Sequence, residues 1–265
     1  MLRDASVLFV VLIGATGAFA QSSSLPPISV EFSQLEGLEE NGRLREWEML
    51  PFELTRDAER LVRITSQEKK RHEELRKSAD LKMVKLFSAP SCASKRYVVD
   101  VSSEECLSGV DLIRTSFYSL ARGLYGESLA DIRIIGKNLH AGNEGLHHGM
   151  IMDLGPILPS GISKDTREVV RMSELETADS FESEVSIRER LRDGIEIDGR
   201  RVSSVTSLSR GHTYLVRLVN YSFKSGSRNM FQRDVVYVLH FAELNMDRTA
   251  LFLWRKLSDR PAPRL

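Results

Sequence analysis

The sequence predicts an α+β fold, in which a mainly antiparallel β-sheet domain follows an N-terminal charged helix and contains one internal helix. Three long segments near the C-terminus, 213–221, 235–243 and 249–257, are rich in the β-branched and aromatic residues that favour strands. Residues 66–74 include no apolar side chain, so this charged stretch cannot face a core. A helical apolar pattern appears near 173–193.

The composition is that of a folded globular protein. The chain has 265 residues, of which 42% are apolar and 28% are charged, and its 37 basic residues balance its 37 acidic ones. Disordered chains combine low hydrophobicity with high net charge, so wholesale disorder is excluded. The zero net charge also excludes a uniformly basic nucleic-acid-binding protein, and no nucleic-acid partner is expected. A chain of this length predicts about one or two domains.

Residues 1–20 have the features of a secretory signal peptide. Arg3 lies near the start, an apolar run spans 7–13, and residues 18–20 match the A-x-A cleavage pattern. The alternatives are an uncleaved anchor and a buried first strand. The rest of the chain has no other long apolar stretch, so the mature protein should have no transmembrane span. We therefore expect cleavage after Ala20 and a soluble protein that is secreted or periplasmic.

An extended N-terminal arm is expected over 21–55, because this segment begins with a linker-like run of serines and prolines. A charged helical segment, 56–87, follows the arm. Thr55 opens its helix, and Asp57 and Glu59 occupy the first turn, where the helix dipole favours acidic side chains.

The polar stretch 66–74 has two interpretations. It is either a solvated helix or hinge, or a surface that contacts a partner or an anionic surface through Lys69, Lys70 and Arg71.

A β-rich domain is expected over 88–258, and a flexible tail over 259–265, where two prolines oppose regular structure. Besides the three C-terminal segments, the candidate strands are 96–101, 116–121, 130–135 and 150–154. The Gly-rich stretch 136–149 lies between the last two of these.

The internal helix is predicted to begin at Ser173, because Ser173 and Glu176 match a capping box. Gly194 is a suitable residue to end it. Asp198 and Gly199, between two alternating segments, predict a two-residue hairpin turn, since both central positions of such a turn need a positive φ.

The segment 235–239 is an almost unbroken apolar run, which is typical of a central strand buried on both faces. The short link 245–248 predicts that 249–257 pairs with it as an antiparallel neighbour. Four aromatic side chains of these strands form either part of the core or a binding face: Tyr214, Tyr221, Tyr237 and Trp254.

The chain contains two cysteines, Cys92 and Cys106. In an oxidising compartment an even number at close spacing predicts a disulfide, and a loop of this size would stabilise the fold by about 3 kcal/mol. The alternative is two buried free thiols. The spacing is not C-x-x-C, which argues against a redox or metal site.

One cluster of side chains has the composition of a metal site. His140, Glu144, His147 and His148 lie close together in the sequence, and Asp153 follows. Imidazole and carboxylate ligands suit zinc or another divalent ion. The spacing is not the H-E-x-x-H pattern of a metal-binding helix. The alternative is a solvated turn with incidental histidines, in which case no cofactor is needed.

The function that these patterns favour is an exported, non-catalytic binding or interaction module, whose partner is an envelope or extracellular protein. The alternative is a metal-dependent hydrolase, in which the histidine cluster holds an ion that polarises a carbonyl or phosphoryl group. His212, at the start of a predicted strand, is either a binding or catalytic group or a half-exposed polar side chain.

Overall fold

The computed structural model describes the following residues: 54–89, 93–95, 98–99, 115–126, 130–142, 147–221 and 232–265. The predicted signal peptide, nearly all of the predicted arm, both cysteines and Glu144 lie outside them. The predicted α+β class with antiparallel sheets is confirmed.

Three short helices form the charged N-terminal segment: α1 (Arg56–Val62), α2 (Ser66–Arg71) and α3 (Glu73–Ser78). The side chain of Thr55 accepts a hydrogen bond from the backbone N–H of Ala58, which confirms the predicted helix start. Extended backbone separates α1 from α2, and a capping box of its own begins α2. The segment is therefore a chain of short helices rather than one continuous helix.

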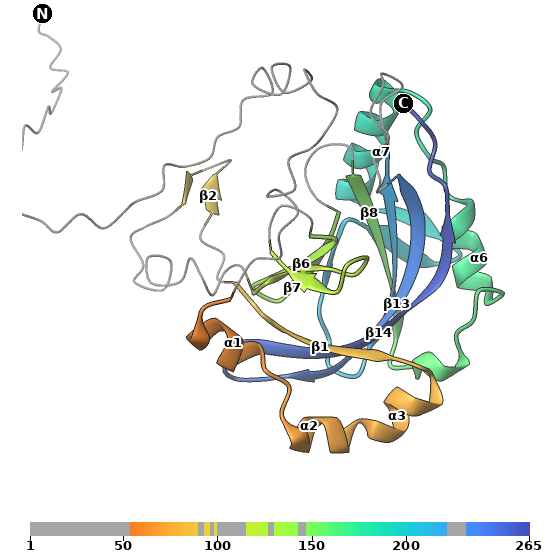
Figure 1. Ribbon diagram of the computed structural model, residues 1–265. Helices are drawn as coiled ribbons and strands as arrows, with labels where there is room; N and C mark the ends of the chain where they lie inside the picture. The colour runs from red at the N-terminus through yellow and green to blue at the C-terminus, as the bar shows by residue number, and fades with distance from the viewer. Residues whose placement is uncertain are drawn as a thin grey trace, which may run out of the picture. The chain divides into compact units, whose positions relative to one another are not determined.

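The larger sheet has seven antiparallel strands in the order β1-β14-β13-β12-β8-β10-β9 (Figure 1). Its strands are β1 (Lys82–Phe87), β8 (His147–Gly155), β9 (Ile195–Ile197), β10 (Arg200–Ser203), β12 (Thr213–Asn220), β13 (Arg233–Leu244) and β14 (Thr249–Arg260). Strands β13 and β14 pair as predicted across the short connection between them. Asp198 and Gly199, with φ of 50° and 76°, form the predicted turn between β9 and β10.

A smaller sheet packs against one face of the larger one. Its strand order is β11-β7-β6-β4-β5. Its strands are β4 (Phe117–Ser119), β5 (Leu124–Tyr125), β6 (Ile132–Ile135), β7 (Asn138–Ala141) and β11 (Val205–Ser207). The short strands β2 (Ala93–Lys95) and β3 (Val98–Val99) pair with each other.

Strand β13 is buried on both faces, as predicted. Val235, Tyr237 and Leu239 belong to a core between the two sheets, whereas Val236 and Val238 face a second core on the other side. Two helices cover this second side, α6 (Arg167–Glu174) and α7 (Phe181–Asp193) (Figure 1). A central strand that separates two cores must be apolar on both faces, which explains its unbroken apolar run.

The predicted internal helix is two helices, and its predicted start is wrong. Ser173 lies near the end of α6 rather than at an N-cap. Ser180 is the N-cap of α7, and its hydroxyl accepts from the backbone N–H of Ser183 while the Ser183 hydroxyl accepts from the N–H of Ser180. The hydroxyl of Ser183 thus takes the place of the glutamate or glutamine that the capping-box pattern has at this position. Gly194, with a φ of 87°, ends α7 as predicted.

A buried arginine joins the end of α6 to the sheet. Arg217 of β12 is fully buried and donates two hydrogen bonds, of 2.7 and 2.8 Å, to the carboxylate of Asp234. Its remaining terminal nitrogen donates to the carbonyl oxygens of Met172 and Leu175. Because its charge is paired and its donors have acceptors, the guanidinium is tolerated inside the second core.

The Gly-rich stretch contains regular structure. It includes all of β7 and the start of β8, and Gly149 is required where these two strands meet. A Cβ on Gly149 would lie 2.3 Å from the backbone carbon of Ala141, so a side chain there would clash.

The C-terminal segment also differs from the predicted flexible tail, because β14 continues to Arg260 and Ala262 is buried against the second core. Among the described residues no helix is long and apolar enough to cross a membrane.

Candidate ligand-binding cleft

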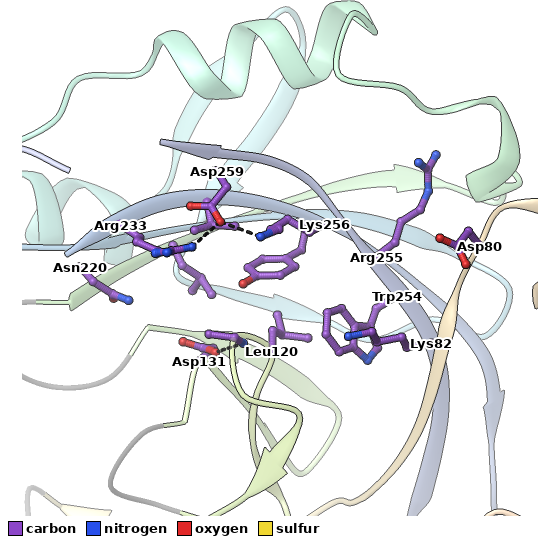
Figure 2. Close-up of a pocket in the computed structure, with 14 residues that line it drawn as sticks. Asp80, Lys82, Leu120, Asp131, Asn220, Arg233, Trp254, Arg255, Lys256 and Asp259 are labelled. Carbon is purple, nitrogen blue, oxygen red and sulfur yellow. Dashed lines mark hydrogen bonds and ion pairs between the residues drawn. The ribbon is translucent and has the colours of Figure 1, made fainter. Parts of the chain in front are cut away.

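The two sheets differ in length, and this difference creates a cleft. Strands β12, β13 and β14 have 8, 12 and 12 residues, whereas the strands of the smaller sheet have two to four. The smaller sheet therefore covers only part of the inner face of the larger one. Beyond its edge lies a cavity of about 370 Å³ (Figure 2). The described lining residues are Asp80, Lys82, Leu120, Ala121, Asp131, Leu218, Asn220, Arg233, Val235, Tyr237, Trp254, Arg255, Lys256 and Asp259.

Aromatic side chains from the larger sheet line the cleft. The ring of Trp254 packs edge-on against Tyr237 and Tyr118, with centroid distances of 5.8 and 6.2 Å. Its indole N–H is buried and faces the Tyr118 hydroxyl without forming a regular hydrogen bond. Burial raises the pKa of both tyrosines, that of Tyr118 to about 12, so both hydroxyls stay protonated at neutral pH.

Charged groups surround this aromatic surface. Asp259 is shared by Arg233 and Lys256, each at 2.6 Å, as the dashed lines of Figure 2 show. The ammonium of Lys82 lies 5.0 Å from the centroid of the Trp254 ring, within range of a cation–π contact.

A buried carboxylate lies on the opposite wall. Asp131 accepts hydrogen bonds from the Ser119 hydroxyl at 3.0 Å and from the backbone N–H of Ala121 at 2.9 Å. Burial raises the pKa of this carboxyl, although both hydrogen bonds act in the opposite direction.

The described members of the predicted metal cluster do not converge. His140 lies on β7, whereas His147 and His148 are adjacent on β8, so their side chains project to opposite faces of the sheet. Nδ1 of His147 lies 2.5 Å from Oδ1 of Asn220, and Nε2 of His148 lies 3.1 Å from the Tyr221 hydroxyl.

Asp153, the last described member, pairs with His212 instead, at 3.0 Å. Within the described ranges no group of three or more His, Cys, Asp and Glu side chains is arranged to hold a metal ion. Burial lowers the pKa of His140 and that of His148 to about 4, so both rings are neutral near pH 7.

The pair of Asp153 and His212 borders a second, more open groove of about 620 Å³, which includes Asp153 and several hydroxyl side chains in its lining. Asp153 also accepts a hydrogen bond from the backbone N–H of Gly155 at 2.7 Å, which fixes the carboxylate. The carboxylate of Asp153 orients the imidazole of His212, as the aspartate of a catalytic triad orients its histidine. In the described part of the chain, however, no serine or cysteine side chain is hydrogen-bonded to the ring of His212.

Of the three residues of the predicted basic surface, Arg71 also contacts the sheet. The guanidinium of Arg71 contacts Glu243 of β13, and His72 lies 2.8 Å from the same carboxylate. Lys69 and Lys70 are exposed to solvent. Arg71 therefore helps to hold α2 and α3 on the sheet, and its half-exposed side chain stays on the surface with the two lysines.

The sequence contains only a partial signal for the cleft. Tyr237 and Trp254 belong to the aromatic set that the sequence singles out, and both are at most 3% exposed, as core residues are. Asp131 and Arg233 have no local pattern that would identify them. They line the same cavity because Asp131, just before β6, and Arg233, at the start of β13, lie at the open end of the interface of the two sheets.

The fold and the cleft define an α+β protein in which two antiparallel sheets pack face to face and leave one end of their interface open. No protein-family model, curated protein or solved structure matches the chain.

Proposed function

We propose that this protein is an exported, non-catalytic binding module that takes its ligand in the cleft between the two sheets. The observation that carries the proposal is the cleft itself: about 370 Å³, with an aromatic floor and charged groups around it. Binding sites are concave and combine apolar surface with placed polar groups, and this cleft combines an aromatic floor with a lining that is mostly polar or charged.

The chemistry of the lining favours binding over catalysis. The described lining includes no His, Cys or Ser side chain, and its buried carboxylate, Asp131, already accepts two hydrogen bonds. Two of its cations are held by Asp259. Such groups recognise charge and shape, but they supply no nucleophile with an adjacent base.

A screen of small fragments tests the cleft. The chain has two tryptophans, so Trp47→Phe leaves Trp254 as the only indole and as a reporter of the cleft. We expect fragments that bind, detected by saturation-transfer NMR, to change the emission of Trp254. Ala121 is exposed at the rim, so Ala121→Phe should fill the space and weaken binding at least tenfold.

The matched control is Val170→Phe, which adds the same bulk to an exposed position on α6. It should bind fragments as the parent does. If Ala121→Phe binds them equally well, the cleft is not the binding site.

We further propose that the chain is exported with cleavage after Ala20, to the periplasm or the outside of the cell. The support is the short apolar run and the A-x-A pattern near the N-terminus. In that compartment Cys92 and Cys106 would form a disulfide.

A further inference from the structure

The cleft lies beside a strand edge that is only half covered. Strand β1 pairs with the first half of β14, from Thr249 to Trp254, and the ladder stops where Lys82 pairs with Trp254. Strand β14 continues to Arg260, and its other edge pairs with β13 as far as the pair of Asp234 and Arg260. Along 255–260, no strand of the described residues pairs with the outer edge.

Burial along β14 changes at the same position. All six residues from Thr249 to Trp254 are buried, whereas none of the six from Arg255 to Arg260 is. The second half of the outer edge is therefore open to another chain, at least with respect to the described residues.

The backbone at Lys256 faces this open edge. The carbonyl of Thr249 accepts from the N–H of Asn245 on the β13 side, and the carbonyl of Arg248 accepts from Ser88 on the β1 side. Successive residues of a strand direct their backbone groups to alternate sides. The alternation along β14 therefore directs the N–H and C=O of Lys256 outward, where β1 no longer reaches.

The same half-strand lines the cleft. Arg255, Lys256 and Asp259 all contribute to its lining, and so do Asp80 and Lys82, which lie just before and at the start of β1. A strand added beside Lys256 would direct alternate side chains toward this lining.

The charges around the cleft favour a partner with an acidic side chain. The lining has four cationic residues and three acidic ones. Of the three, Asp259 is shared by two of the cations, Asp131 accepts from Ser119 and Ala121, and Asp80 is exposed to solvent. Within the described residues the ammonium of Lys82 has no carboxylate partner. Charges on an edge strand also oppose pairing between identical copies.

We propose that an extended segment of a partner protein, carrying an acidic side chain, binds by strand addition to the outer edge of β14 at Lys256 and inserts side chains into the cleft. This proposal rests on the binding function proposed above and names the class of its ligand.

The probe is a phage-displayed library of random twelve-residue peptides, selected on the exported protein and then synthesised. We expect selected peptides to contain Asp or Glu, and exchange of that residue for Asn or Gln to weaken binding at least tenfold. Lys256→Pro removes the outward N–H and should also weaken binding at least tenfold. Lys256→Ala keeps that N–H, so it should weaken binding clearly less.

A second measurement needs no variant, in case Lys256→Pro fails to fold. N-methylation of alternate peptide bonds in the selected peptide removes its own ladder donors, and it should abolish binding to the unmodified protein. The amide of Lys256 should also exchange with deuterium more slowly when the peptide is bound. Equal binding of the methylated peptide, or unchanged exchange, would overturn strand addition.

The outcomes separate the two proposals. If fragments bind in the cleft but the library yields no peptide, the cleft remains a binding site and strand addition is refuted. If neither fragments nor peptides bind, both proposals fail. Sedimentation could also detect a dimer that Lys256→Pro abolishes. This result would show that a second copy of the chain binds the edge, and it would overturn the proposal of a partner segment.

Discussion

His148 shows how one buried side chain sets the response of the protein to acid. Its ring is 3% exposed, its Nε2 faces the Tyr221 hydroxyl, and its Nδ1 is buried without a partner. The Tyr221 hydroxyl also accepts a hydrogen bond from the backbone N–H of Ala178, which holds it beside the ring. Burial, with a contribution from the nearby positive charge of Arg217, lowers the pKa of His148 to about 4.

We predict that stability falls as the pH drops from about 6.5 to about 4. The unfolded chain binds a proton on this histidine near pH 6.5, whereas the folded chain does so only near pH 4. The stability that the neutral ring contributes is therefore fully present above the pKa of His148 in the unfolded chain. It is lost as the pH falls toward the pKa of His148 in the folded chain. For His148 alone the loss between pH 7.5 and pH 5 is on the order of 2 kcal/mol.

Urea unfolding at these two pH values checks this prediction. His148→Gln should reduce the loss but not remove it, because burial also lowers the pKa of His140 to about 4. Lys70→Gln, at an exposed position, should retain the full loss. Identical pH dependence in His148→Gln and the parent would show that this ring does not oppose protonation.

At the scale of elements, β13 is the strand on which both cores depend. Val236 and Val238 are at most 1% exposed and lie in the core beneath α6 and α7. An aspartate at either position would be an unpaired buried charge, which costs several kcal/mol or forces neutralisation. We predict that Val236→Asp and Val238→Asp each remove most of the stability, since a typical domain has about 5–15 kcal/mol in total.

The comparison variant is Lys70→Glu on α2, where the side chain is exposed. It should shift the free energy of unfolding by less than about 0.5 kcal/mol. Urea titration of the three variants decides the matter. Wild-type midpoints for both valine variants would place the core elsewhere.

The helices show why local patterns locate some elements and miss others. Ser173 and Glu176 match a capping box in sequence, yet the helix begins after Ser180. Capping patterns compete with one another along a chain, and packing helps to select among them: Ile187 and Leu191 of α7 lie in the second core. Gly194 was predictable because few residues other than glycine adopt its φ of 87°.

At the scale of the whole molecule, the first properties to test are export of the chain and cleavage of its predicted signal peptide. We predict that the exported protein has the intact mass of a chain whose first residue is Gln21, because an A-x-A pattern precedes that residue. The measurement is mass spectrometry of protein recovered from the periplasm or the medium. A species that still carries residues 1–20 would show that the segment is an anchor or part of the fold.

The same material tests the disulfide. Cys92 and Cys106 are the only cysteines of the chain, and in an oxidising compartment we predict no alkylation without reduction and two alkylated cysteines after it. Reduction should lower the free energy of unfolding by about 3 kcal/mol in the chain-entropy model. Two equivalents of label in the unreduced protein would leave both as free thiols.

The sequence by itself determined the α+β class, the long C-terminal strands, the hairpin turn at Asp198 and Gly199, and the burial of β13 on both faces. These properties follow from short-range rules: strand periodicity, positive φ in tight turns and the composition of buried strands. Each is recorded in neighbouring residues, so no long-range contact is needed to infer it.

Only the tertiary structure decided which polar residues are buried and which residues meet. Arg217 lies in an otherwise apolar strand, and its burial is acceptable only because Asp234 and two carbonyls of a distant helix reach it. The cleft likewise exists because the smaller sheet is shorter than the strands it covers, which brings Asp131 opposite Tyr237. Such contacts depend on the alignment of segments far apart in the chain, and no local pattern records that alignment.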